Sequence, residues 1–346
     1  MKSIYGKRKR YFMPQYNPTK EEIKYRTYCI RNEIRIYPIG IENDNEHWKI
    51  GVNIGPYQRW EKQNVSPSIY DKHTIWPEYY RMCKYYYDKR IRKKYKDLLR
   101  DIFNGSTTPH VMRDDRTGIG CISKFGLGLT INIDKYFPIL TGKKMHPHIF
   151  ETEFKWFISG HTNIKELQEK GNKIWNEWAD KAGNLGPVYG HQLRNFNSDG
   201  HDQLESVLNS IQNDPDSRRH IISLWNPSQL KEMALPTCYL YFQFFVENNN
   251  LNMFALQRSA DLFLGVPYDM ALFAQLLLYV AEKTNLKAKT IDVKFIDAHI
   301  YHNQHEAVFE YLNAPWYGQT EYTYENEILT LKNYKPGKVI TAPVAI

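Results

Sequence analysis

The distribution of apolar and polar residues predicts a chain in which strands and helices are mixed. Runs typical of strands cover His47–Ile54, Gly118–Ile133, Ile221–Trp225, Tyr239–Val246 and Leu251–Leu256. Apolar residues at helical spacing predict helices over Tyr85–Phe103, Phe150–Ser159, Ile164–Lys170 and Met270–Lys283. Such a mixture indicates an α+β fold.

Length and composition indicate a globular protein with more than one folded part. The 346 residues are 42% hydrophobic and 14% aromatic, which is enough for a substantial core. No stretch approaches the roughly 20 consecutive apolar residues of a membrane span, and the basic segment 1–10 lacks the apolar centre of a signal peptide. We expect a cytoplasmic protein with a basic, Tyr-rich extension over residues 1–84 and a catalytic domain over residues 85–346.

Positive charge is concentrated in the N-terminal part. Residues 1–105 contain 23 Lys and Arg against 12 Asp and Glu, so the rest of a chain whose formal charge is +8 is slightly acidic. With Trp48 and Trp60 among these basic residues, one interpretation of residues 1–84 is a module that touches nucleic acid or another partner. The other interpretation, favoured because basic charge alone says little, is a solvated extension packed on the enzyme. Nucleic acid is expected only through this extension.

The four cysteines, Cys29, Cys83, Cys121 and Cys238, form no CxxC pair and show no metal-ligand spacing. A reduced protein with one functional thiol and no metal is the simplest interpretation. Cys29, Cys83 and Cys121 are expected to be structural.

The candidate functional thiol is Cys238, which lies within a stretch from Asn213 to Tyr301 that also contains Arg218, Arg219 and Arg258. A thiolate is populated near neutral pH only beside positive charge, which arginine supplies permanently. Arginine is also the preferred ligand of a phosphate dianion. A nucleophile beside an anion clamp predicts covalent chemistry on a phosphorylated substrate.

An ordered set of short motifs in this chain resembles the thymidylate synthase family from about Tyr85 to the C-terminus. Before Cys238 the motifs are 115-DRTG-118, Glu153 ahead of Trp156-Phe157, 174-IWNEWAD-180, 186-GPVYG-190 and 213-NDPDSRR-219. From there on they are 235-LPTC-238, 257-QRSAD-261, 265-GVP-267, 297-DAHIY-301 and 342-APVAI-346. The resemblance implies a mostly antiparallel sheet flanked by helices, with the sheets of two subunits stacked in a homodimer that shares its active sites.

The resemblance also implies roles for individual residues. The sulfur of Cys238 adds to C6 of a pyrimidine nucleotide, which makes C5 nucleophilic toward the one-carbon unit of 5,10-methylenetetrahydrofolate. Glu153 serves as general acid/base, and Tyr189 assists removal of the C5 proton. The implied phosphate ligands are Arg116, Arg218, Arg219, Arg258 and Ser259, and the implied deoxyribose ligands are His299 and Tyr301. The implied folate contacts are Trp175, Asp261, Gly265 and Ile346, with Lys143 near the glutamate tail.

Two positions depart from the usual synthase pattern. Asp269 follows Val266-Pro267-Tyr268 where synthases have asparagine, and Tyr239 stands beside the nucleophile where they have histidine. An asparagine amide matches the O4 acceptor and N3–H donor of uracil, whereas a carboxyl group matches the N4 donors and N3 of cytosine. Burial raises a carboxyl pKa, so the proton can lie on either partner. The deoxycytidylate branch of the family, which includes the dCMP hydroxymethylases, has aspartate at this position. The resemblance therefore predicts dCMP as substrate.

Three reactions and one unrelated function remain open at this point. Trp175, Trp178 and the C-terminal run favour reductive methylation, because they resemble a lid that excludes water. Hydroxymethylation of dCMP remains an alternative, as does ordinary thymidylate synthesis from dUMP. A function outside catalysis would be nucleic-acid binding on an inactive enzyme scaffold. Cys238, Glu153 and the arginines together speak against that loss of catalysis.

Overall fold

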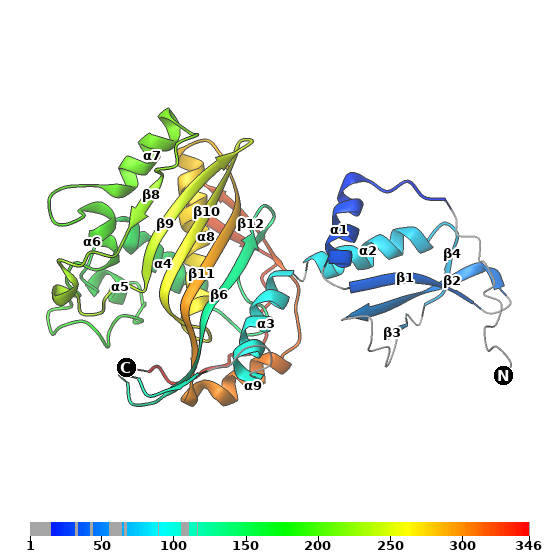
Figure 1. Cartoon of the computed structure of the whole chain (residues 1–346), viewed down its shortest axis with the longest axis horizontal. Coiled ribbons are helices and arrows are strands. Elements are labelled where there is room, and N and C mark those ends of the chain that lie inside the picture. Colours follow the sequence, from blue (N-terminus) through cyan, green and yellow to red (C-terminus); the bar gives the residue numbers. More distant parts are fainter. Residues whose placement is uncertain are drawn as a thin grey trace. The chain divides into compact units, whose positions relative to one another are not determined.

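The structure is a computed structural model that describes residues 15–31, 34–41, 44–54, 64–65, 68–88, 90–104, 111–115 and 117–345. The chain divides into two compact units, Met1–Arg90 and Ile91–Ile346 (Figure 1). The predicted boundary after residue 84 falls inside helix α2 (Ile75–Asp88), whose inner face is packed in the core of the first unit. The second unit therefore begins later than the sequence suggested.

The first unit is a small sheet covered by two helices. Its elements are α1 (Lys20–Arg31), β1 (Ile34–Ile41), β2 (Asp44–Ile54), β3 (Asn64–Val65), β4 (Tyr70–Asp71) and α2. β2 pairs antiparallel with β1, β3 and β4. It contains the strand predicted over His47–Ile54, which is thereby confirmed. Residues alternate along the strands, so that Ile34, Ile36, Trp48 and Ile50 face the helices and form the core.

The position of Trp48 corrects one expectation. This side chain is only 3% exposed, so it contributes to packing and cannot touch a nucleic acid or protein partner. Trp60 lies outside the described residues.

The second unit is built on a six-stranded sheet with the order β5-β6-β11-β10-β9-β8. Its strands are β5 (Val111–Arg113), β6 (Cys121–Asn132), β8 (Ile221–Ser223), β9 (Tyr239–Glu247), β10 (Asn250–Asp261) and β11 (Lys287–Tyr301). β10 and β11 are parallel, and the other neighbours are antiparallel. Strands β7 (Tyr136–Phe137), β12 (Thr320–Glu325) and β13 (Ile328–Lys332) form a separate small sheet. The predicted α+β fold is confirmed.

Helix α8 (Gly265–Lys283) crosses from β10 to β11 and packs against both strands (Figure 1). A parallel pair needs such a crossover, and α8 is apolar on nearly every side because α4 (Pro147–Ile158) covers it in turn. The other helices are α3 (Arg90–Asn104), α5 (Lys165–Glu169), α6 (Tyr189–Arg194), α7 (Gln203–Asn213) and α9 (His305–Asn313). Short 3-10 turns lie at Leu230–Glu232 and His302–Gln304.

The face of the large sheet opposite α8 presents apolar side chains to solvent. On β8, β9 and β11 these are Ile221, Phe245 and Ile296, which are 37%, 62% and 37% exposed. The strand register places Tyr241 and Leu256 opposite each other on this same face. An apolar sheet face of this kind is typical of a protein–protein interface.

Candidate active site

The candidate nucleophile, Cys238, lies immediately before β9 in a loop that hydrogen bonds hold in place. Its backbone N–H donates to Tyr189 Oη at 2.9 Å, and the Thr237 hydroxyl donates to Leu224 O at 3.1 Å. Both partners come from segments outside β9, so the loop is fixed from two sides. The sulfur is partly buried at the inner end of the sheet.

Arg258 on β10 holds this loop and supplies charge to the sulfur. Its Nε donates to Thr237 O at 2.9 Å, and its Nη2 donates to Pro236 O at 2.7 Å. The same Nη2 lies 3.9 Å from Cys238 Sγ. The guanidinium therefore positions the nucleophile as well as offering a positive charge to a bound anion.

The expectation that arginine would populate a thiolate is not met in the single chain. Burial raises the pKa of the Cys238 thiol above its ordinary value, and the nearby Arg258 charge only partly offsets this. The resting sulfur is therefore protonated at neutral pH, and its proton must leave as the sulfur forms a bond.

Tyr189 sits at the start of α6 and joins the nucleophile to a wall of aromatic rings. Three residues before it, Gly186 has a φ of +73° and lets the chain pass close to the backbone of Glu232, because a Cβ at that position would lie 2.0 Å from Glu232 O. The Tyr189 ring lies 5.0 Å from Tyr239 and 5.6 Å from Trp175, centroid to centroid. Burial raises the pKa of Tyr189 well above its usual value, so its hydroxyl keeps its proton.

Glu153 on α4 is a buried acid beside this wall. Trp175 Nε1 donates to Glu153 Oε1 at 3.0 Å. Burial raises the pKa of Glu153 to about 8; the Trp175 hydrogen bond opposes the rise, and the charge of Asp269 adds to it. At neutral pH Glu153 therefore holds a proton that it can release near pH 8, as a general acid/base requires.

We expect this raised pKa to make stability depend on pH. A carboxyl group with a pKa of about 8 when folded and about 4.3 when unfolded binds more protons in the folded state between these values, so the free energy of unfolding falls as pH rises. Glu153→Gln removes this dependence. Relative to wild type, the variant should gain about 1 kcal/mol per pH unit between pH 5 and 8, as urea unfolding would measure. The exposed Glu169→Gln is the matched control, and parallel wild-type and Glu153→Gln curves would contradict the prediction.

Asp269 and Tyr239, the two departures noted in the sequence, are in direct contact. Tyr239 Oη donates to Asp269 Oδ1 at 2.5 Å, and Gln257 Nε2 donates to Asp269 Oδ2 at 2.8 Å. Burial raises the pKa of Asp269, while these two donors oppose the rise. Each carboxyl oxygen thus already has one donor, and this fixes the orientation of the group.

Gln257 was not singled out from the sequence, although it lies in the 257-QRSAD-261 motif. It is 1% exposed, and its Oε1 has no hydrogen-bond partner among the described residues. The sequence does offer a sign of its role. Gln257 follows Met253 and Ala255 at every second position of β10, so it is a polar residue on the face of the strand that points to the core.

The candidate phosphate and sugar ligands lie in three places. Ser259 pairs in register with Asp297 on β11, and the Asp297 carboxylate lies 3.2 Å from His299 Nδ1. His299 and Tyr301 rings are 5.0 Å apart near the end of β11. Arg218 and Arg219 are exposed in the loop before β8, and no described contact brings them to Cys238. Arg116 lies outside the described residues.

The candidate folate contacts differ in whether the structure leaves them available to a bound folate. Trp175 is partly exposed and stands next to Glu153 and Trp178, so it offers an aromatic surface at the site. The Asp261 carboxylate instead accepts hydrogen bonds from the backbone N–H groups of Phe263 and Leu264, in the turn before α8, and from the Gln304 side chain. Gly265 begins α8. Ile346 lies outside the described residues.

Lys143 is placed away from solvent. Its Nζ donates to Phe263 O at 2.6 Å, and burial lowers its pKa to about 8. In this arrangement it does not present a charge to a folate glutamate tail.

Within the residues that the structure describes, no group of three or more His, Cys, Asp or Glu side chains is arranged to hold a metal ion. The described helices also include none that is both long and apolar enough to cross a membrane.

The fold and the site define an enzyme in which a partly buried thiol lies close to an arginine, two tyrosines and two acidic groups, an arrangement suited to covalent catalysis. Residues 93–346 match the family model for thymidylate synthase, which covers 254 of the 346 residues. The chain belongs to the thymidylate synthase family. Members of this family transfer a one-carbon unit to C5 of a pyrimidine nucleotide with methylenetetrahydrofolate as cosubstrate, and they are typically homodimers.

Proposed function

We propose that this enzyme methylates dCMP at C5, with Cys238 as nucleophile and Asp269 as the residue that reads the base. The observation that carries the proposal is the Tyr239–Asp269–Gln257 hydrogen-bond chain beside Cys238. It explains both departures from the synthase pattern as one structural unit, because the substituted tyrosine orients the substituted aspartate.

The base preference follows from the atoms left available on Asp269. With donors from Tyr239 and Gln257 already in place, the carboxylate oxygens are aligned as acceptors. One oxygen accepts from the N4 amino group of cytosine, and the other shares a proton with N3. Burial raises the pKa of Asp269, which favours a carboxyl group that holds this proton. Uracil has an O4 acceptor where cytosine has the N4 amino donor. The Asp269 oxygen that accepts from N4 of cytosine would therefore face O4 of uracil, and two acceptors repel each other.

The chemical steps use the side chains around the sulfur. Cys238 Sγ forms a bond to C6 as its proton departs, and Arg258, 3.9 Å away, stabilises the negative charge that develops. Glu153, with its pKa near 8, exchanges a proton with the base. Tyr189, whose hydroxyl accepts a hydrogen bond from Cys238 N–H, would assist removal of the C5 proton. C5 would then bond to the one-carbon unit of the folate, and loss of the C5 proton would break the bond between that carbon and the folate nitrogen. Hydride from the folate would reduce the exocyclic methylene to methyl as the C6–S bond breaks, which releases the product and leaves the sulfur to regain its proton.

The aromatic wall of Trp175, Trp178 and Tyr189 fits a planar cosubstrate. The indole Nε1 of Trp178 is buried without a partner among the described residues, which leaves one donor for a bound group. Methylenetetrahydrofolate supplies the one-carbon unit and, in reductive methylation, the hydride. The chain's own contribution is to orient the reactants and to exclude water, and this wall favours methylation over hydroxymethylation.

We also propose that two subunits stack through the exposed apolar sheet face and share their active sites. Burial of Ile221, Phe245 and Ile296 in that interface would remove the exposed apolar surface. Arg218 and Arg219 lie in the loop before β8, next to this face, so each subunit can extend them to the phosphate bound by its partner. A solution mass equal to the 41.1 kDa of one chain would contradict this assembly.

The decisive experiment offers dCMP and dUMP separately, with methylenetetrahydrofolate, and identifies the products by mass. We expect dCMP to be consumed and its mass to increase by one CH2 group. An increase by CH2O would replace methylation with hydroxymethylation, because water rather than hydride would have completed the reaction. Turnover of dUMP alone would overturn the assignment of the base.

A further inference from the structure

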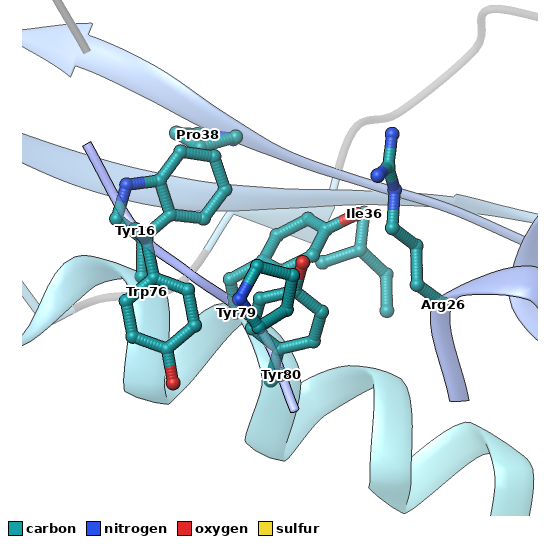
Figure 2. Close-up of a pocket in the computed structure, with 8 residues that line it drawn as sticks. Tyr16, Arg26, Ile36, Pro38, Trp76, Tyr79 and Tyr80 are labelled. Atoms are coloured by element: carbon teal, nitrogen blue, oxygen red, sulfur yellow. The ribbon is translucent and has the colours of Figure 1, made fainter. Parts of the chain in front are cut away.

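The first unit contains a pocket of about 290 Å³ whose walls are mainly aromatic (Figure 2). Tyr16 lines it from the segment before α1, and Trp76, Tyr79 and Tyr80 line it from α2. The volume lies near the lower end of the roughly 300–1,000 Å³ range of small-molecule pockets. It suits a single planar group better than a large ligand.

The rings around this pocket are arranged with faces and edges in contact. Tyr16 stacks on Tyr80 and Trp76, with centroids 5.5 and 6.3 Å apart. Tyr79 meets Tyr80 and Trp76 edge to face, at 4.9 and 5.4 Å. The Tyr16 hydroxyl donates to Glu22 Oε1 at 2.8 Å, which fixes the outermost ring. Tyr16 is 36% exposed, so this fixed ring is accessible from solvent.

Arg26 on α1 gives the pocket a positive charge. Figure 2 shows it beside the aromatic cluster, and its charge acts on the hydroxyls of Tyr79 and Tyr80. The Glu22 carboxylate acts on Tyr80 with the opposite sign and more weakly, and it does not line the pocket. A permanent cation disfavours cationic ligands and favours an anion next to a flat aromatic group. A nucleotide combines these two properties, since its base stacks on rings and its phosphate pairs with arginine.

The charge of the whole chain points to a polymer rather than a small anion. Residues 1–90 contain 18 Lys and Arg but only 10 Asp and Glu, whereas residues 91–346 contain 28 of each. The entire formal charge of +8 therefore belongs to the unit that has the pocket. Such an excess attracts a polyanion and is not needed for binding one nucleotide in the other unit.

We propose that the first unit binds single-stranded nucleic acid, with one base stacked in the aromatic pocket and the adjacent phosphate on Arg26. Aromatic rings beside basic residues are the usual means of binding single strands without reading their sequence. A duplex hides the faces of its bases, so it cannot fill the pocket in the same way. This function is separate from the chemistry at Cys238, and it uses none of the catalytic residues.

The test measures binding of the full-length protein to fluorescent 15-nucleotide dT and rU strands by anisotropy at several salt concentrations. Tyr16→Ala should weaken binding about tenfold, because it removes one stacking partner. Arg26→Gln should weaken binding and reduce the slope of log K against log salt by about 0.7, the effect of one lost phosphate contact. The matched control is Arg81→Gln on α2, since Arg81 is not among the pocket-lining residues and pairs with Glu78. It should change affinity less than Arg26→Gln does.

Turnover of the nucleotide substrate should be unchanged in Tyr16→Ala and Arg26→Gln, because both residues lie outside the catalytic unit. Unchanged far-UV circular dichroism of each full-length variant shows that the first unit still folds. The dT and rU arms distinguish DNA from RNA as the source of the strand. Unchanged affinity in both pocket variants would overturn the proposal. So would equal competition by a 15-base-pair duplex, or competition by free dCMP at the concentrations at which the strands compete.

Discussion

Replacing Cys238 with serine is expected to abolish turnover while the protein still binds its nucleotide. A serine hydroxyl in this position lacks an adjacent base to activate it, and it is a far weaker nucleophile than sulfur toward a ring carbon. The bond it must form exists only after binding, so kcat should fall by roughly 10⁴-fold or more and nucleotide affinity should stay within about threefold. Single-turnover kinetics and equilibrium binding of dCMP measure these two quantities separately.

Cys121→Ser is the matched control for this substitution. Cys121 is a buried cysteine of β6 in the same unit, and it has no place in the proposed chemistry. It should retain its turnover. If Cys238→Ser retained full activity, covalent catalysis by this residue would be wrong. If the wild-type protein turned over neither dCMP nor dUMP, the alternative of an inactive scaffold would replace the proposed enzyme.

Mixing two inactive variants extends the same experiment to the shared site. In a heterodimer of Cys238→Ser with the double variant Arg218→Ala/Arg219→Ala, one site combines an intact cysteine with intact partner arginines. Random exchange of subunits should then restore up to about a quarter of wild-type activity. No recovery after subunit exchange would show that these arginines serve the site of their own chain.

The sequence predicted the elements whose environment is uniform along their length. β9 and α8 were identified because continuous apolar runs are buried in any arrangement of neighbours. We predict an end of β10 at Leu256, but the strand continues to Asp261 because β11 pairs with it as far as that residue, whereas β9 pairs with it only as far as Gln257. Local composition cannot show such pairing.

The first unit was harder to predict because tyrosine is compatible with both cores and surfaces. The local pattern does not separate α2 from the helix that follows, so the sequence predicts Tyr85 in that next helix. In the structure Tyr79, Tyr80 and Cys83 turn one face of α2 toward β1 and β2. Pro77 is tolerated there because it lies in the first turn of the helix.

The site was identified residue by residue, but its contacts depend on the fold. Tyr239 and Asp269 are thirty positions apart, and they meet because the Tyr239 side chain on β9 faces the side of the sheet that α8 covers. The same burial that assembles the site raises the pKa of Cys238, against the expectation from its arginine neighbours. The contact depends on tertiary packing and the pKa shift on desolvation, and a linear sequence shows neither.

Asp269→Asn is expected to reverse the preference between the two pyrimidines. An asparagine amide in this position donates to O4 and accepts from N3–H, so it matches uracil and leaves cytosine with two mismatched groups. Mismatches of buried hydrogen bonds cost selectivity of about 10²- to 10⁴-fold. The ratio of kcat/KM for dCMP to that for dUMP should fall by this amount, and steady-state assays with each nucleotide measure it.

Tyr239→Phe distinguishes a base-reading network from a general packing effect at the same site. It removes the hydroxyl that donates to Asp269 Oδ1 but keeps the ring that packs against Tyr189 and Phe273. A hydrogen bond to a charged group contributes about 1.5–3 kcal/mol, so kcat/KM for dCMP should fall by roughly 10- to 100-fold while the variant stays folded. The exposed Asp199→Asn serves as a control that alters charge but not the site. If Asp269→Asn lowered activity equally with both nucleotides, Asp269 would support the site without reading the base, and the Tyr239 contact would be structural.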